Sequence, residues 1–172
     1  MIGEELVQER DTADPATRVG ERLHLLATGA EQVVEVVGRA SRMRATEVHA
    51  LVAIAAAERA GVPATPGELA LTLRLTTGAI TGLVDRLVRS GHVVREPDAA
   101  DRRRVRIVCR PSGHAVASEL VQTLTERASA VLRALTTEDR DVVDRFLAEV
   151  GFATLAFLHG QDGRPPRLDG IR

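Results

Sequence analysis

Two groups of residues in the middle of the chain have the chemistry to bind phosphate. Threonines and glycines recur over residues 76–82, and hydroxyl groups next to free backbone N–H groups at a helix start are typical phosphate ligands. Arginines follow, and the guanidinium group binds both phosphate and guanine. The candidate DNA-contacting residues are Thr76, Thr77, Gly78, Thr81, Gly82, Arg86, Arg89, Arg102, Arg103 and Arg104. For Arg86 and Arg89 the alternative is pairing with Asp85 or with an acidic residue near the arginine run.

The charge of the chain is unevenly distributed. The net charge is only −1, and all 23 basic residues are arginines. Residues 74–110 hold nine arginines against four acidic residues, a local balance of +5, whereas residues 1–44, 45–73 and 111–172 each have a balance of −2. One basic segment between acidic flanks favours a single contact surface for a polyanion.

Composition and motifs exclude several functions. The chain has no Trp, no Tyr and three Phe, so an aromatic stacking surface for single-stranded nucleic acid is excluded. The sequence contains no P-loop, nucleophile elbow, GxGxxG or paired His/Glu motif, so we expect no enzymatic activity and no cofactor. No apolar run is long enough to span a membrane, and the first residues lack a secretory signal. We therefore expect a cytoplasmic protein without membrane contact.

The single cysteine and the five histidines give little indication of metal chemistry. No two histidines lie four residues apart and no second cysteine is present, so we predict no metal site. Cys109 lies on the expected inner side of a strand, where cysteine behaves as a small apolar residue; the alternative is a redox sensor. His24 and His49 are candidates for lining a ligand pocket, the alternative being solvent-facing or core positions.

The apolar periodicity predicts the elements that position these groups. Helical spacing predicts helices over residues 15–43, 46–60, 66–73, 77–89, 111–135 and 137–159, and alternation predicts strands over 92–95 and 105–109. In the fourth helix the stripe of Ile80, Leu83, Val84 and Leu87 is expected to face the core, so the opposite face presents Thr77, Thr81, Asp85, Arg86 and Arg89. In the second strand we expect Val105, Ile107 and Cys109 to face inwards.

The order α-α-α-α-β-β-α-α indicates a mainly α fold with a small β-hairpin wing. Two short helices followed directly by a hairpin form a winged helix-turn-helix, whose second helix enters a major groove. We expect residues 45–110 to form this DNA-binding lobe, and residues 15–44 and 111–160 to form a helical dimerisation region. Residues 1–14 and 161–172 lack an apolar period and are expected to be flexible tails.

Four short motifs occur in order along the lobe: Glu68-Leu69-Ala70, Thr81-Gly82-Leu83-Val84-Asp85-Arg86-Leu87, Ser90-Gly91-His92-Val93-Val94-Arg95 and Asp101-Arg102-Arg103-Arg104-Val105. In these motifs residues 68–113 resemble the MarR family of transcriptional regulators, of which Asp-x-Arg in the wing is the most specific feature. The similarity extends over the helical flanks to residues 15–160. The chain departs from the family where Cys109-Arg110 replaces the usual Leu-Thr before the following helix, and Pro111 or Ser112 is expected to compensate for the missing hydroxyl cap.

The resemblance implies a homodimer that binds a pseudo-palindromic operator in double-stranded DNA. It implies that Arg103 reaches the minor groove, while Asp101 supports the wing through a salt bridge to a neighbouring arginine. We expect a repressor that a small aromatic or phenolic ligand releases from DNA, with a ligand pocket where the first, second and fifth helices meet the lobe. The alternative is a winged-helix protein-interaction module of the anti-repressor type, without operator recognition.

Overall fold

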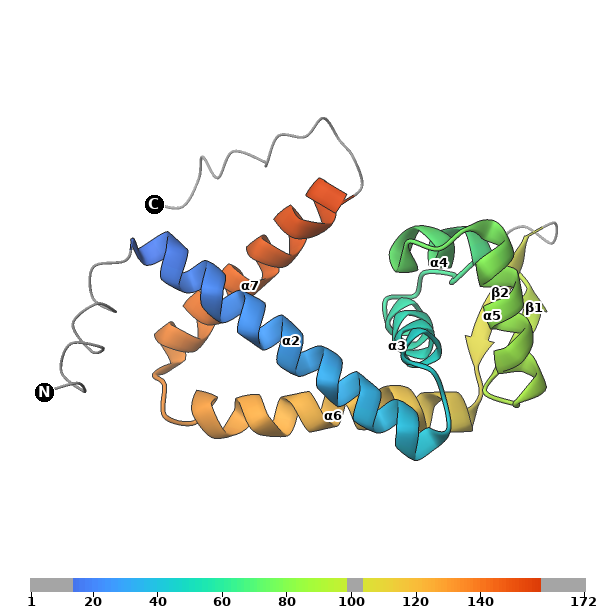
Figure 1. Ribbon diagram of the computed structural model, residues 1–172, viewed down its shortest axis with the longest axis horizontal. Coiled ribbons are helices and arrows are strands. Elements are labelled where there is room, and N and C mark those ends of the chain that lie inside the picture. The colour runs from blue at the N-terminus through green and yellow to red at the C-terminus, as the bar shows by residue number, and fades with distance from the viewer. Residues whose placement is uncertain (1–13, 99–103, 159–172) are drawn as a thin grey trace, which may run out of the picture.

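The computed structural model describes residues 14–98 and 104–158, and within them the predicted order of elements is confirmed (Figure 1). The elements are α2 (Pro15–Ser41), α3 (Ala45–Arg59), α4 (Pro66–Leu73), α5 (Thr77–Arg89), β1 (Val93–Pro97), β2 (Val105–Cys109), α6 (Pro111–Leu132) and α7 (Thr137–Leu158). The residues predicted as tails, apart from Asp14, and the hairpin tip with Asp101, Arg102 and Arg103 lie outside the described residues. Within the described part, no helix combines the length and apolar character needed to cross a bilayer.

The molecule consists of a small lobe and a set of long helices. Helices α3, α4 and α5 gather with the β1–β2 hairpin at one end, and α2 and α6 run from there as long crossing helices (Figure 1). Helix α3 packs on α2, α4, α6 and β2, and therefore lies at the junction of the lobe with the long helices. Helix α7 crosses α2 at the far end in Figure 1, and none of its side chains over residues 137–157 is buried.

The core fills the lobe and continues between α2, α3 and α6. The predicted inward stripe of α5 is confirmed, because Ile80, Leu83, Val84 and Leu87 are all buried. They pack in one cluster with buried residues of α3, β1 and β2, among them Leu51, Ile54, Val93 and Ile107. Burial of a large aliphatic side chain contributes roughly 1.5–3 kcal/mol, so this cluster fixes how α5 and the hairpin sit on α3.

The prediction for the second strand is wrong at one residue. Ile107 and Cys109 face the core, but Val105 is 43% exposed. Val105 pairs with Pro97 at the outer end of the antiparallel hairpin, whereas the buried Val93 and Cys109 pair at its other end. The alternation of residue types determines which side of the strand a side chain faces. Whether that side is buried depends on which other elements pack against it.

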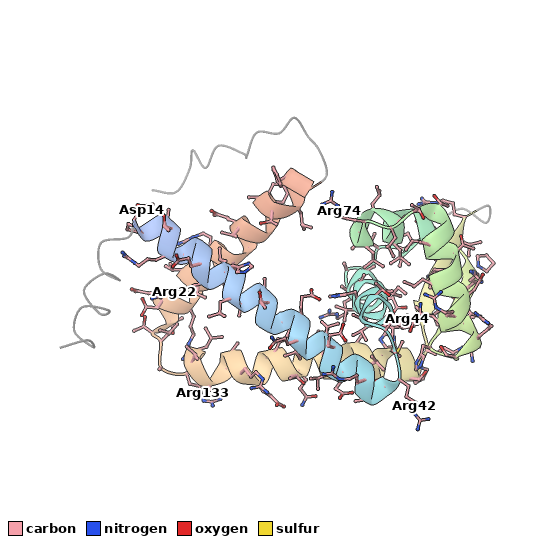
Figure 2. The ribbon with its side chains drawn as sticks, viewed as in Figure 1. Asp14, Arg22, Arg42, Arg44, Arg74 and Arg133 are labelled. Atoms are coloured by element: carbon pink, nitrogen blue, oxygen red, sulfur yellow. The ribbon has the colours of Figure 1, made fainter. Side chains whose placement is uncertain are left out.

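Local capping patterns determine the helix ends of the lobe. Helix α4 starts with a capping box, in which Glu68 N–H donates to Thr65 Oγ1 at 3.3 Å and Thr65 N–H donates to Glu68 Oε2 at 2.8 Å. Helices α2 and α4 both end at an arginine in the left-handed conformation, Arg42 and Arg74, which are labelled in Figure 2. Helix α6 has no side-chain cap; the Ser112 hydroxyl donates instead to the Gly91 carbonyl at 3.0 Å.

Candidate nucleic-acid interface

The first turn of α5 is an exposed cluster of small polar residues. Thr76 is the N-cap, and its Oγ1 accepts a hydrogen bond from Ala79 N–H at 3.3 Å. Thr77 and Gly78 are exposed on this turn, and a Cβ atom added to Gly78 would meet no other atom within 4 Å. The structure therefore places most of the predicted helix contacts together at a helix N-terminus, where unpaired backbone N–H groups attract anions.

Thr81 and Gly82 lie one turn further along α5. The Thr81 hydroxyl donates to the Thr77 carbonyl at 2.9 Å, and its oxygen can still accept a hydrogen bond. Gly82 is half-buried, and the nearest atom to an added Cβ would be Nη1 of Arg86 at 3.7 Å. Gly82 therefore leaves space beside the Arg86 side chain rather than an open surface.

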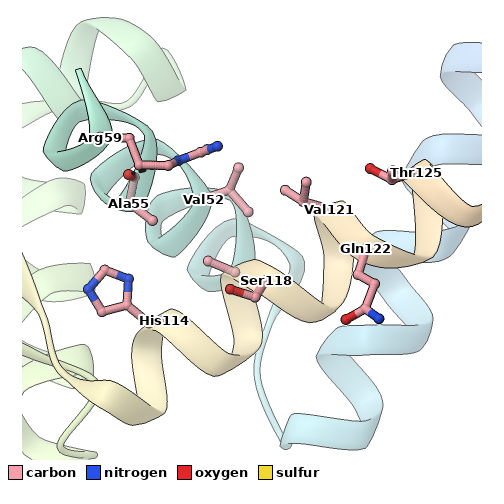
Figure 3. Close-up of a pocket in the computed structure, with 9 residues that line it drawn as sticks. Val52, Ala55, Arg59, His114, Ser118, Val121, Gln122 and Thr125 are labelled. Carbon is pink, nitrogen blue, oxygen red and sulfur yellow. Dashed lines mark hydrogen bonds between the residues drawn. The ribbon is translucent and has the colours of Figure 1, made fainter.

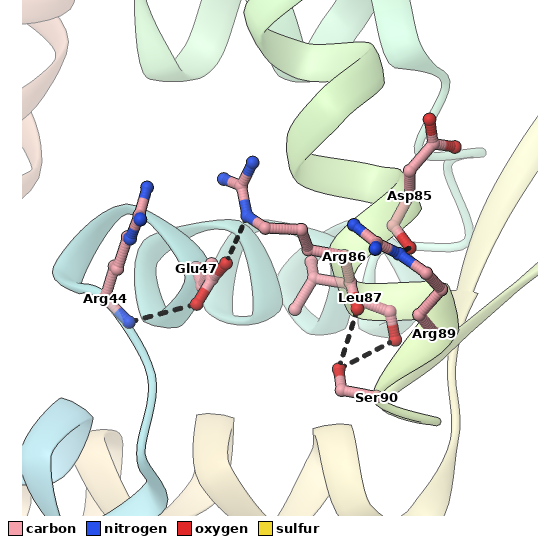
Figure 4. Close-up of polar contacts among 7 residues, drawn as sticks. All are labelled: Arg44, Glu47, Asp85, Arg86, Leu87, Arg89 and Ser90. Atoms are coloured by element: carbon pink, nitrogen blue, oxygen red, sulfur yellow. Dashed lines mark hydrogen bonds and ion pairs between the residues drawn. The ribbon is translucent and has the colours of Figure 1, made fainter.

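Arg86 has a partner that its position in the sequence did not predict. Its Nε donates to Glu47 Oε1 at 2.8 Å, and the other oxygen of this carboxylate accepts Arg44 N–H at 3.0 Å (Figure 4). Burial of Glu47 opposes its ionisation, but the hydrogen bonds from Arg44 and Arg86 outweigh this effect and hold its pKa below the ordinary value. The partner is thus neither Asp85 nor a wing acid, and Arg86 connects α5 to the start of α3.

Arg89 remains on the outer face of α5. Its Nε donates to the backbone carbonyl of Asp85 at 3.3 Å, and among the described residues no carboxylate forms a salt bridge with it. The Asp85 side chain pairs instead with Arg95 of β1, with 2.6 Å between Oδ1 and Nη2. Arg89 therefore keeps an uncompensated charge beside the exposed turns of α5.

The base of the wing is held by ion pairs. Arg106 and Glu96 face each other across the hairpin with 2.7 Å between Nη2 and Oε2. Arg104 is exposed and lies 3.5 Å from Glu68 Oε1, so it links the wing to the first turn of α4. Asp98 N–H donates to the Arg104 carbonyl at 2.9 Å and closes the described part of the hairpin. Asp101, Arg102 and Arg103 lie outside the described residues, and their proposed wing roles stay predictions.

A cavity of about 300 Å³ lies between α3 and α6 (Figure 3). Its lining consists of Val52, Ala55, Arg59, His114, Ala117, Ser118, Val121, Gln122 and Thr125. His24 and His49, the predicted pocket residues, are not among the residues that line this cavity. His49 turns towards α2, where its Nε2 lies 3.3 Å from Glu31 Oε2, and α2 contributes none of the lining residues, so His24 is also excluded.

No sequence pattern pointed to the two basic residues that line the cavity. Arg59 ends α3 and His114 lies in the first turn of α6, so they are 55 positions apart in the chain. Within its own helix, each of these two polar residues would be expected to face solvent. Only the packing of α3 on α6 brings them to one cavity.

Cys109 is buried beside Glu58 and His114. Glu58 Oε1 accepts Cys109 N–H at 2.7 Å, and Glu58 Oε2 lies 3.1 Å from His114 Nε2. Burial, with the negative charge of Glu58 in addition, raises the pKa of the Cys109 thiol to about 12. A thiol with this pKa is protonated at neutral pH, which disfavours its action as a redox-sensing thiolate.

The sequence and the fold were compared with those of known proteins. Residues 43–104 match the sequence model of the MarR family. The HTH-type transcriptional regulator YcgE of Bacillus subtilis is 38% identical over 87 residues, which cover 51% of this chain and 56% of YcgE. The HTH-type transcriptional repressor YetL of the same organism is 31% identical over 85 residues, covering 49% of this chain and 51% of YetL. The chain thus spans about half the length of the curated relatives it matches.

Solved structures with the same fold cover more of the chain. The S. aureus MepR–DNA complex has a TM-score of 0.53 at 18% identity and covers 76% of this chain and 96% of MepR. Apo MarR from E. coli has a TM-score of 0.54 at 24% identity, covering 76% of this chain and 94% of MarR. At these identities the likeness concerns the fold alone, and it confirms the predicted mainly helical, winged-helix architecture.

Proposed function

We propose that this chain is a MarR family protein, and that it is a non-enzymatic transcriptional regulator that binds double-stranded DNA. The observation that carries this proposal is the exposed first turn of α5, with Thr76, Thr77 and Gly78 beside a basic hairpin. A helix of this kind fits a major groove, and the wing then lies near the backbone or the minor groove. The MepR–DNA complex shows that a protein with this fold binds DNA.

In this proposal α5 and the wing have different tasks. Thr81 and Arg89 project from α5 towards base edges and phosphates, while Arg102, Arg103 and Arg104 contact the backbone or the minor groove. Asp101 supports one of these arginines by a salt bridge. Arg86 acts as a positioning residue, because its bond to Glu47 holds α5 at a fixed angle on α3. We further propose a homodimer that acts as a repressor in the cytoplasm and binds a pseudo-palindromic operator.

Substitutions in the wing and in α5 are expected to change DNA binding in different ways. Arg103→Ala should weaken binding to operator and random DNA alike and lower the salt slope by about 1 per lost phosphate contact, hence about 2 per dimer. Thr81→Ala should instead reduce the preference for operator over random DNA, by about 1–3 kcal/mol for each lost base contact. Fluorescence anisotropy with DNA from upstream of the gene, at two salt concentrations, measures both effects.

The matched control is Arg133→Ala, which removes an equal charge from the exposed end of α6, far from the lobe (Figure 2). This variant should bind DNA like the wild-type chain. If the wild-type chain binds no DNA at any salt concentration, the proposed function is wrong, and the alternative of a protein-interaction module is supported. If Arg103→Ala and Arg133→Ala weaken binding equally, the wing has no specific contact.

We also propose that the cavity between α3 and α6 binds the effector, a small aromatic carboxylate. Val52, Ala55 and Val121 offer apolar walls for a ring, and Arg59 at the rim offers a guanidinium group for the carboxylate (Figure 3). The cavity lies where α3, which packs on the lobe helix α4, meets the long helix α6. A ligand that separates these two helices would change the position of the lobe and thereby release the DNA.

Hydroxybenzoates are expected to raise the melting temperature of the wild-type chain and to release it from DNA. A charged hydrogen bond contributes about 1.5–3 kcal/mol, so Arg59→Met should weaken ligand binding by about 10- to 100-fold. His49→Gln, outside the cavity, should leave the affinity unchanged. Thermal shift and DNA release measured at the same ligand concentrations test this; equal affinities of the Arg59→Met and wild-type chains would show that the carboxylate binds elsewhere.

A further inference from the structure

Three side chains with metal-binding atoms meet where the wing joins the long helices. Glu58 lies in the last turn of α3, Cys109 ends β2 and His114 lies in the first turn of α6. One carboxylate oxygen, the Sγ atom and one ring nitrogen all lie within 4.8 Å of one another. Because each residue comes from a different element, their spacing in the sequence, 51 and 5 residues, resembles no metal motif.

The hydrogen bonds of the cluster orient these atoms. Cys109 N–H donates to Glu58 Oε1 at 2.7 Å, which fixes the carboxylate plane and leaves Oε2 facing His114 Nε2 at 3.1 Å. A ligand held by such an outer hydrogen bond is pre-oriented for a metal ion. The Sγ atom makes a long hydrogen bond, 3.8 Å to the Leu51 carbonyl, which a metal–sulfur bond can replace.

We propose that Glu58, Cys109 and His114 bind a zinc ion. Zinc prefers a tetrahedral set of sulfur, nitrogen and oxygen ligands, and a three-residue site leaves its fourth position to a water molecule. On binding, the thiol proton passes to solvent and the neutral imidazole binds through Nε2 with its proton on Nδ1. The ion then replaces the His114–Glu58 hydrogen bond and cross-links α3, β2 and α6, so that the wing strand is tied to the helix that follows it.

The site is tested with the metal alone. The tag-free full chain, stripped with a chelator, is titrated with Zn²⁺ against a chromophoric competitor and separately with Co²⁺. We expect one ion per chain, a rise in melting temperature, and a thiolate-to-Co²⁺ charge-transfer band. Loss of an outer-shell partner alone typically costs 10- to 100-fold in affinity, so Glu58→Gln, Cys109→Ser and His114→Gln should each weaken binding at least tenfold, and Cys109→Ser should abolish the band.

The matched control is His49→Gln. His49 also pairs with a glutamate, Glu31 at 3.3 Å, but no described cysteine lies beside it, so its loss should leave the zinc affinity unchanged. Glu58→Gln keeps an acceptor for Cys109 N–H, and His114 is half exposed, so both variants should fold in the absence of metal, as circular dichroism would show. The proposal is overturned if the three variants bind zinc as tightly as the wild-type chain, or if Co²⁺ gives no thiolate band.

The zinc proposal stands independently of the DNA-binding proposal. DNA binding is measured with the metal-free chain, and metal binding is measured without DNA. A chain that binds zinc but no DNA contradicts only the proposed regulatory function. A chain that binds operator DNA while the cluster variants leave its zinc affinity unchanged contradicts only the metal site.

Discussion

Gly113→Ala is expected to destabilise the fold by about 3 kcal/mol or more, which is a large part of the typical stability of a domain. A Cβ atom at this position would lie 2.3 Å from the His92 carbonyl oxygen and 3.2 Å from Leu51 Cδ2. The carbonyl belongs to the backbone and already accepts Arg110 N–H at 2.8 Å, so it cannot rotate away as a side chain would. Overpacking in a well-packed core costs about 1–3 kcal/mol of stability and occasionally more. Because the neighbour of Gly113 is backbone and cannot move aside, we expect a cost at the upper end of this range.

Urea denaturation followed by circular dichroism measures this effect. Gly67→Ala serves as the control, since Gly67 is also in the first turn of a helix, is exposed, and would bring an added Cβ no closer than 3.9 Å to another residue's atoms. Its free energy of unfolding should stay the same or rise by up to about 1 kcal/mol. A Gly113→Ala variant as stable as the Gly67→Ala variant would show that α6 does not approach His92 this closely.

Phe152→Asp is expected to convert a dimer to monomers and to weaken operator binding at least about a hundredfold. Phe152 is 70% exposed on α7, and Phe146, Leu147 and Phe157 of the same helix are also exposed. Several large apolar side chains left exposed on one helix favour an interaction site. A second copy of the chain is the proposed occupant, and a carboxylate in the interface would lack a partner. Two linked half-site contacts typically bind 10²–10⁴ times more tightly than one, so loss of the dimer removes this gain.

Light scattering at micromolar concentration and anisotropy with operator DNA measure the two effects. Val62→Asp is the control, because Val62 is about as exposed, at 52%, but lies between α3 and α4 in the lobe. This variant should remain dimeric. A monomeric wild-type chain, or a Phe152→Asp chain that keeps the wild-type mass, would contradict the proposed homodimer.

Local sequence determined the elements of the lobe and the exposed face of α5. The capping box of Thr65 and Glu68 spans four residues, and the buried stripe of Ile80, Leu83 and Leu87 repeats within two helical turns. Hydrogen bonds and periodicities of this range depend only on neighbours in the chain, so the helix boundaries and the inner faces followed from residue types alone. For the same reason the polar turn of α5 could be recognised as a candidate DNA contact.

Only the tertiary structure decided which distant residues meet. Glu47 and Arg86 are 39 positions apart, and Glu58 and Cys109 are 51 apart. The cavity and the cluster both depend on the packing of α6 against α3, and the choice of Glu47 rather than Asp85 for Arg86 depends on the angle at which α5 crosses α3. Such contacts follow from the interlocking of side chains over a whole interface. No local pattern encodes them, because each partner alone is an ordinary polar residue of its own element.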